Sequence, residues 1–258
     1  DRVTVFQRND ASWQAYQTIQ RPSGAGGGAF GKAIALQGDM LVIGGSRTSA
    51  GIAGRDVVYL YRRTGILWPT LPTDSMFGDG NLIGSEEAFG HALSLSANQL
   101  VVGASGDDEL GSDCGAAYLY GRDHGGDGNW GLVRKLLPSN GAAGDRFGTA
   151  VALLDNRCVV GAPERPIGVM PAGGAYVYER DAGFQGNWGE TAHLQPNVSA
   201  QADMDFGASV TIGPDLIAVG APLEDVSAQG TDGSVHLFQH SGDWTHMQRI
   251  VPYADQVV

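Results

Sequence analysis

The chain has 258 residues, with 28 Asp or Glu against 16 Lys or Arg, so its formal net charge is −12. This acidic balance argues against a nucleic-acid or anionic-membrane surface, because both need clustered Lys and Arg. Hydrophobic residues make up 42% of the chain, a normal share for a globular protein. This share argues against disorder. No apolar run reaches the length of a membrane span, so membrane insertion is not expected.

The chain begins with a short pair of predicted strands. Val3 to Arg8 and Trp13 to Gln20 are rich in β-formers and are joined by a polar turn at Asn9-Asp10. Residues 23–29 follow as a glycine-rich connector. This segment lacks the GxxxxGK pattern of a phosphate-binding loop, so we interpret it as a linker.

From residue 30 onward one pattern occurs four times. Each copy opens with Phe-Gly, and these starts lie 59, 58 and 59 residues apart, at Phe30, Phe89, Phe147 and Phe206. An apolar strand ending in Gly-Gly, Gly-Ala-Ser or Gly-Ala-Pro follows, and then an aromatic strand such as Ala175 to Tyr178. A regular period of this length indicates a repeat architecture. We expect the four Phe side chains to occupy equivalent buried sites.

Each repeat predicts four short strands. In the third they are Thr149 to Leu154, Arg157 to Gly161, Gly174 to Glu179 and Trp188 to Leu194. Four short strands separated by turn residues are typical of a propeller blade. All five tryptophans fall at the start of the fourth strand: Trp13, Trp68, Trp130, Trp188 and Trp244. We expect the Tyr and Trp rings of the outer strands to be packed with their polar edges toward water.

The predicted fold class is therefore all-β, a β-propeller of four-stranded antiparallel blades in one domain. It comprises a leading half repeat, residues 1–29, and four full repeats, residues 30–88, 89–146, 147–205 and 206–258. The half repeat corresponds to the third and fourth strands only. The chain would then be a fragment of a larger propeller or an unusually closed one.

The Phe-Gly start, the VVGAP strand ending at Pro163 and the GGAYVY strand that follows resemble the FG-GAP repeat. This family builds the propeller heads of integrin α subunits and occurs in bacterial secreted and surface proteins. The resemblance implies an extracellular, secreted or cell-surface module for binding or adhesion, with a protein or glycan as ligand. Family heads close with seven blades, so self-association or further blades would complete the ring.

Calcium sites of the family lie in the turn between the first and second strands. Here those turns carry one carboxylate at most, as at Asp39, Asp155 and Asp215. Calcium takes six to eight oxygen ligands. We therefore carry no calcium site over and expect no cofactor.

Acidic residues gather instead between the second and third strands. In a propeller these loops share one face with the loops that lead from one blade to the next. The candidate metal site is Asp107, Asp108, Glu109 and Asp113; the candidate ligand-binding residues are Glu224, Asp225, Asp232, Asp145, Arg146 and Arg165; the same face would also carry Asp79, Glu86, Glu87, Asp203 and Asp205. The alternative is that these Asp side chains only cap turns.

The loops between the second and third strands differ from repeat to repeat, whereas the strands are alike, so a specific binding site would be expected in these loops. The third repeat has Ile167 and Met170 in its loop, and the first has Arg47. Three histidines, His236, His240 and His246, do not have the spacing of a zinc signature, so we expect them at the surface or partly buried. Cys158 is expected as a small buried residue, unpaired with Cys114.

No nucleophile elbow, phosphate loop or HExxH motif is present, so we do not expect an enzyme. One alternative function is a lectin, in which several exposed Trp rings would stack on sugars. Another is a non-catalytic propeller domain of a larger secreted enzyme.

Overall fold

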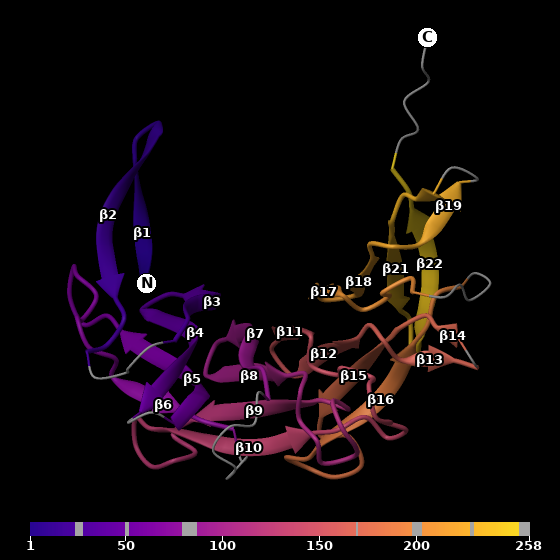
Figure 1. Ribbon diagram of the computed structural model, residues 1–258, viewed down its shortest axis with the longest axis horizontal. Coiled ribbons are helices and arrows are strands. Elements are labelled where there is room, and N and C mark those ends of the chain that lie inside the picture. Colours follow the sequence, from indigo (N-terminus) through magenta and orange to yellow (C-terminus); the bar gives the residue numbers. More distant parts are fainter. Residues whose placement is uncertain are drawn as a thin grey trace.

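The computed structural model describes residues 1–23, 28–49, 52–78, 87–168, 170–197, 203–227 and 230–252. These residues form strands, turns and loops, and they include no helix of the length and apolarity needed to cross a membrane. Four antiparallel sheets of four strands follow one another around an open arc (Figure 1). The predicted fold class, an all-β propeller of four-stranded blades, is confirmed.

The chain enters through the hairpin β1 (Arg2–Asn9) and β2 (Ser12–Gln20). Blade 1 contains β3 (Phe30–Gln37), β4 (Met40–Ser49), β5 (Ile52–Arg62) and β6 (Asp74–Met76). Blade 2 contains β7 (Phe89–Ser96), β8 (Gln99–Ala104), β9 (Ala116–Arg122) and β10 (Trp130–Leu136). Blade 3 contains β11 (Ala150–Leu154), β12 (Arg157–Ala162), β15 (Gly174–Arg180) and β16 (Trp188–Leu194). Blade 4 contains β17 (Ser209–Ile212), β18 (Leu216–Ala221), β21 (Ser234–His240) and β22 (Trp244–Ile250).

Strand order within each blade runs from the inside of the arc to the outside. The first strands, β7, β11 and β17, lie toward the centre, and β10, β16 and β22 lie toward the rim (Figure 1). Two short hairpins, β13 (Pro166–Ile167) with β14 (Met170–Pro171) and β19 (Asp225–Ser227) with β20 (Gly230–Thr231), extend from loops of blades 3 and 4. Because neighbouring strands within a blade are antiparallel, the loops between second and third strands lie on the same face as the loops between blades. We call this side the loop face.

The hydrophobic core is divided into wedges between neighbouring units. The Phe of each Phe-Gly pair is buried, from 9% exposed at Phe30 to 0% at Phe147 and Phe206. Each ring meets the aromatic residue at the same position of its own third strand, with ring centroids 5.4 Å apart for Phe147 and Tyr176. The prediction of equivalent buried Phe sites is confirmed, and each Phe stabilises a blade-to-blade joint.

Glycine pairs allow the blades to approach closely at these joints. A Cβ on Gly103 would overlap the carbonyl oxygen of Gly148 in blade 3, and one on Gly161 would overlap that of Gly207 in blade 4. Gly148 and Gly207 themselves have positive φ angles of 92° and 101°, which favour glycine. The Gly of each Gly-Ala pair therefore leaves room for the backbone carbonyl of the next Phe-Gly pair.

Two local expectations differ from the structure. Trp68 does not open a strand, because Pro69 and Pro72 interrupt the ladder and the fourth strand of blade 1 begins only at Asp74. The Tyr118 and Tyr176 hydroxyls do not reach water; both side chains are fully buried and donate hydrogen bonds to Asp107 and Asn140.

Candidate functional site

The loop face of blades 2, 3 and 4 is built on three repeated positions. The first is the third residue after the Gly-Ala pair, at Asp107, Arg165 and Glu224. The second is the aromatic residue of the third strand, at Tyr118, Tyr176 and His236. The third is its partner on the fourth strand, at Lys135, His193 and Arg249. We call each set an anchor triad.

The blade 2 anchor triad is a buried ion pair. Asp107 is 3% exposed, and one carboxylate oxygen accepts hydrogen bonds from the Tyr118 hydroxyl at 2.7 Å and from Lys135 Nζ at 2.8 Å. Lys135 also pairs with Glu109 at 2.7 Å. A hydrogen bond from the backbone nitrogen of Gly115 to the Asp107 carbonyl closes the loop between β8 and β9. Lys135 therefore pairs with two of the four carboxylates that the sequence offered as metal ligands.

The blade 4 anchor triad replaces the tyrosine with a histidine. Glu224 is fully buried, and it accepts hydrogen bonds from Arg249 at 2.7 Å, from Ser234, and from His236 Nε2 at 2.9 Å. Burial alone would raise the pKa of Glu224, but the bonds from these three residues lower it below its usual 4.5. The other His236 nitrogen lies 3.1 Å from His246 Nε2. Because its pKa is lowered, the Glu224 carboxylate stays ionised at neutral pH.

The blade 3 anchor triad has the opposite polarity. Arg165 stands where the other blades have an acid, and it donates to Asp145 at 2.9 Å and to the Asn140 carbonyl at 2.7 Å. His193, on the fourth strand, stacks on Tyr176 with ring centroids 4.4 Å apart. Burial, and then the Arg165 charge, lower the pKa of His193 from 6.5 to about 4. The histidine is therefore neutral at physiological pH.

Several acidic side chains of the loop face remain at the surface. Asp108, Glu109, Asp225 and Asp232 are exposed, and Asp113 and Arg146 are half-buried. The Asp108 carboxylate accepts a hydrogen bond from the Asp113 backbone nitrogen at 2.8 Å, which is a turn-capping contact. Arg146 pairs with Glu164 at 3.0 Å. The predicted ligand residues thus divide into anchors, Asp145, Arg165 and Glu224, and surface groups.

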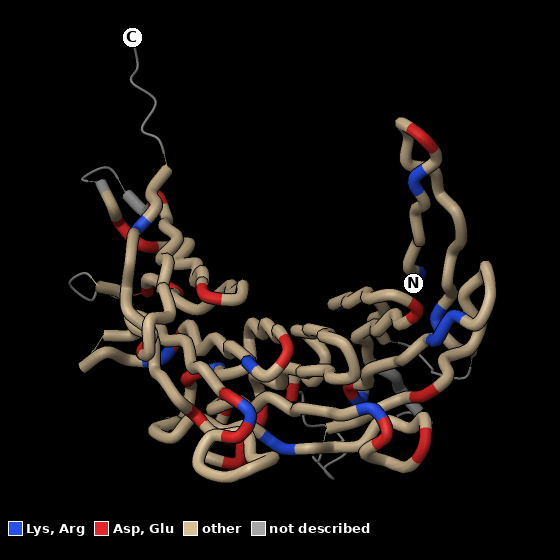
Figure 2. Tube along the Cα trace, turned by 180° about the vertical axis from the view of Figure 1, so that it is seen from behind, with Lys and Arg blue, Asp and Glu red and all other residues tan. Residues whose placement is uncertain are grey.

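A second acidic group lies where blade 3 meets blade 4. Burial, followed by the charges of Glu164 and Asp203, raises the pKa of Asp205 above its usual value. Carboxylates gathered in this way create a negative potential that attracts cations. Acidic positions also lie along the whole arc (Figure 2).

The described residues contain no group of three or more His, Cys, Asp or Glu side chains placed to hold a metal ion. Asp79 and Glu86 lie outside the described residues, and the side chain of Arg47 is not described either. Met170 is 43% exposed and Ile167 half-buried. Cys114 and Cys158 are buried and unpaired, and burial raises the pKa of the Cys114 thiol to about 11.

The tryptophans do not form a repeated exposed platform. Trp68 and Trp188 are buried, while Trp130 and Trp244 are half-buried and Trp13 is exposed. Trp244 lines a cavity of about 330 Å³ between blades 3 and 4, together with Glu179, Thr191, His240 and Asp243. In this cavity a blade-edge Trp adjoins the carboxylates of Glu179 and Asp243.

Sequence reasoning missed the cationic members of the anchor triads, Lys135 and Arg249, and the hydroxyl of Ser234. The signal was available in the period, because each residue stands one repeat away from its counterpart. It was overlooked because the residue type changes from blade to blade while the position stays constant.

The comparisons with known proteins agree with the repeat pattern. No curated protein matches the chain. A mannose phosphorylase from Leishmania mexicana, solved with phosphate, is a similar structure at 10% identity and a TM-score of 0.32. The match covers 89% of this chain and 64% of that one, so the chain spans less than two thirds of its length. A likeness this weak carries no functional argument.

The family comparison is specific. The FG-GAP repeat matches residues 78–120, 130–178 and 188–238, which together make up more than half of the chain. The first match begins after β6 and the other two begin at β10 and β16, and all three end in the aromatic third strands of blades 2, 3 and 4. The chain belongs to the FG-GAP repeat family.

Proposed function

We propose that this chain is an extracellular, secreted or cell-surface binding module that recognises a basic protein surface through its loop face. The observation that carries the proposal is that the carboxylates of the loop face fall into a buried set and an exposed set. Asp107 and Glu224 are buried with their own cations, while Asp108, Asp203 and Asp232 are exposed on the same face. The buried groups fix the loops, and the exposed groups are available to a partner.

Fixed loops favour binding because little conformational entropy is lost when the partner arrives. Exposed carboxylates contribute to orientation and to the rate of encounter more than to affinity. The net charge of −12 acts in the same direction by attracting a basic partner over distance. Integrin α heads, which this family also builds, would be a functional parallel for adhesion.

We propose a binding role and no catalytic one. Asp107 and Glu224, two of the buried acids of the face, are each held by a cation and by a hydroxyl donor. Groups fixed in this way have no free proton-accepting capacity directed at a substrate. The same role would suit a non-catalytic domain of a larger secreted enzyme.

An array of extracellular proteins and glycans, read with and without calcium, tests this proposal. The informative variant is a loop-face triple, Asp108→Asn, Asp203→Asn and Asp205→Asn. Asn keeps the capping bonds and tolerates the positive φ of Asp203 and Asp205. Its matched control is an opposite-face triple, Asp127→Asn, Asp155→Asn and Asp215→Asn, at exposed positions.

We expect a basic protein ligand that the loop-face triple loses and the opposite-face triple keeps. A blank protein array, or equal losses in both triples, would sink the proposal. Calcium dependence of a retained signal would redirect it to the metal site predicted at Asp107, Asp108, Glu109 and Asp113.

The second candidate function is carbohydrate binding. It is favoured by the cavity of about 330 Å³ beside Trp244, which combines an aromatic ring with the carboxylates of Glu179 and Asp243. Sugars stack on aromatic rings and donate hydroxyl protons to carboxylates. Glycan-array binding that Trp244→Ala abolishes and Trp13→Ala leaves intact would favour this function over the first.

A further inference from the structure

Residues 137–145, which connect blade 2 to blade 3, are held against blade 3 by its side chains. We call this segment the strap. The Tyr178 hydroxyl donates to the Leu137 carbonyl at 2.8 Å. The Glu190 carboxylate accepts two hydrogen bonds from Ser139, one from its backbone nitrogen at 2.8 Å and one from its hydroxyl at 2.9 Å. The first half of the strap is therefore fixed by β15 and β16.

The second half of the strap is held by Arg165. Its guanidinium donates to the Asn140 carbonyl at 2.7 Å and to the Asp145 carboxylate at 2.9 Å. The Tyr176 hydroxyl adds a bond to the Asn140 side chain at 2.8 Å. Asp145 is 1% exposed, so its charge is compensated by the guanidinium and not by water. The blade 3 anchor triad thus balances one cation with one carboxylate of the strap.

A proton on His193 would disturb this balance. His193 stands on the fourth strand, at the position that Lys135 and Arg249 occupy in blades 2 and 4. Those two residues are cations throughout the physiological pH range, and each meets a buried carboxylate of its own blade. His193 has Arg165 as its charged neighbour instead. Protonation would therefore place a second cation in the triad without a second carboxylate.

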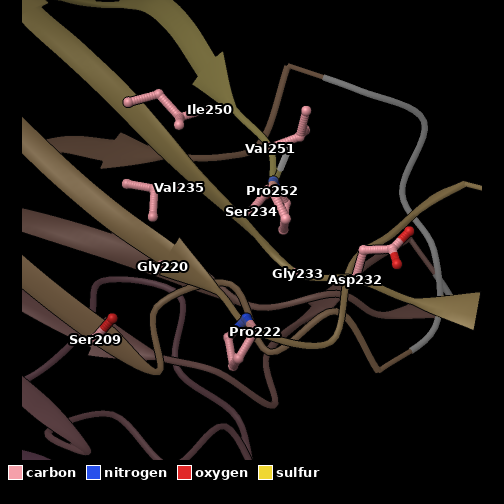
Figure 3. A pocket seen from close by; sticks show the side chains of 10 residues that line it. All are labelled: Ser209, Gly220, Pro222, Asp232, Gly233, Ser234, Val235, Ile250, Val251 and Pro252. Carbon is pink, nitrogen blue, oxygen red and sulfur yellow. The ribbon is translucent and has the colours of Figure 1, made fainter. Parts of the chain in front are cut away.

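A glycine leaves one nitrogen of His193 without a partner. In blade 4, the hydroxyl of Ser234 donates to the buried Glu224, and Ser234 lines a groove of about 460 Å³ at the blade edge (Figure 3). The equivalent residue of blade 3 is Gly174. A Cβ there would lie 2.8 Å from His193 Nε2 and 3.3 Å from Arg165 Cδ. His193 Nε2 is buried and has no hydrogen-bond partner among the described residues, so no acceptor stands ready for an added proton.

The other groups near the imidazole do not supply a counter-charge. The titratable and charged groups around it are Tyr176, Arg165, Asp145, Glu190 and Cys114. Burial raises the pKa of the Tyr176 hydroxyl and of the Cys114 thiol, so both are neutral in acid. Both carboxylates are already engaged, Asp145 by Arg165 and Glu190 by the strap. Burial, and then the Arg165 charge, accordingly hold the pKa of His193 at about 4.

We propose that protonation of His193 releases the strap from blade 3. The imidazolium repels Arg165, and the guanidinium then leaves the Asn140 carbonyl and the Asp145 carboxylate. The sheets stay folded, because among the described residues blade 3 holds the strap through side chains and not through a β-ladder. Blades 2 and 4 lack this response at the same position, since Lys135 and Arg249 keep their charge. The release is a property of the chain alone and does not depend on the proposed binding function.

Two buried cysteines allow the release to be measured. Cys114 lies under the strap, because a Cβ on Gly141 would come within 2.8 Å of its sulfur. Cys158 is 0% exposed in β12, so it reacts only when the blade itself opens. The full chain is treated with dithiodipyridine, which reacts with thiols in acid as well as at neutral pH. Each rate is divided by that of glutathione at the same pH, and peptide mapping assigns the labelled cysteine.

We expect the normalised rate at Cys114 to rise at least about fivefold from pH 7 to pH 5, while the rate at Cys158 stays constant. The reason is linkage: His193 binds its proton more tightly once the strap has opened, so acid favours the open form. His193→Phe and His193→Gln do not titrate and should label Cys114 equally at both pH values. His124→Phe, at an exposed histidine, should behave as wild type.

Two results would overturn the proposal. One is a Cys114 rate that does not rise in acid, or that rises as much in either His193 variant as in wild type. The other is a Cys158 rate that rises together with the Cys114 rate, because the blade as a whole would then be unfolding.

Discussion

Individual residues on the loop face act through buried charge. An anchor triad removes a carboxylate or a guanidinium from water, which is costly unless a partner compensates it. In blades 2 and 4 the compensation comes from the fourth strand, and in blade 3 it comes from Asp145 in the loop between blades. The position is constant although the sign of the charge changes, so each triad should be sensitive to the loss of one member.

The first prediction concerns Glu224. Glu224→Gln leaves Arg249 without its buried counter-charge, and we expect the free energy of unfolding at neutral pH to fall by about 2–4 kcal/mol. Urea denaturation followed by Trp fluorescence measures it. Asp215→Asn, an exposed carboxylate, should change stability by no more than about 0.5 kcal/mol. Equal effects would mean that the buried pairing is unimportant.

The second prediction concerns His193 and pH. Its pKa in the folded protein, about 4, lies below the usual 6.5, so the unfolded chain binds the proton first as the pH falls. Stability is therefore full above pH 6.5 and is lost as the pH falls toward 4. One such group contributes a slope of at most about 1.4 kcal/mol per pH unit, less here because the ring is only half-buried.

His193→Phe keeps the ring stack on Tyr176 and removes the titration. We expect the curve of unfolding free energy against pH to flatten between pH 6.5 and 4. His124→Phe, at an exposed histidine, serves as the control and should leave the slope as in wild type. An unchanged slope in His193→Phe would contradict the assignment.

At the scale of elements, the unit of construction is the joint between blades. Ser94 and Ser96 on β7 accept backbone hydrogen bonds from Leu153 and Asp155 at 2.9 and 3.1 Å, so neighbouring first strands are also tied directly. The Phe ring fills the wedge and the glycine pair sets the separation. A joint should therefore tolerate no added atom at its glycine.

The third prediction compares one glycine position in two blades. Gly161→Ala forces its new Cβ against the carbonyl of Gly207, and we expect a loss of about 2–3 kcal/mol in the free energy of unfolding. Gly220→Ala, the same substitution in blade 4, meets the Ser209 hydroxyl of its own blade, which can rotate to another rotamer, and should cost less than about 1 kcal/mol. Similar losses in the two variants would show that blade contact is not what constrains Gly161.

Much of the arrangement of strands into blades could be predicted from the sequence. The period placed the strands of blade 3 within a residue or so of β11, β12, β15 and β16, because pattern and turn residues agree there. Blade 1 was harder, since Pro69 and Pro72 delay β6 beyond Trp68. The anchor triads were overlooked, because the residue type changes from blade to blade and a buried carboxylate looks like an exposed one in sequence until a partner such as Lys135 is placed in space.

At the scale of the whole molecule, the described chain is an open arc of four blades with a loop face and an opposite face. The loop face carries exposed carboxylates such as Asp108 and Asp203, and the opposite face carries others such as Asp127 and Asp155. The proposed basic partner distinguishes the two faces, so substitutions on the opposite face should leave its binding intact.

The fourth prediction follows from that separation. The opposite-face triple should bind the basic array ligand as wild type does, whereas the loop-face triple should not. Titrating the ligand against both variants measures this. Loss of binding in both variants would indicate a general disturbance of folding and would contradict the prediction.

The most direct test of the account is the ionic-strength dependence of ligand binding, measured by surface plasmon resonance with the strongest basic protein from the array. For wild type and the opposite-face triple, we predict an association rate that falls as salt is added. For the loop-face triple, we predict a rate already lower by at least about tenfold at low salt and a weaker dependence on salt. Identical salt curves for all three proteins would contradict the claim that this face carries the ligand.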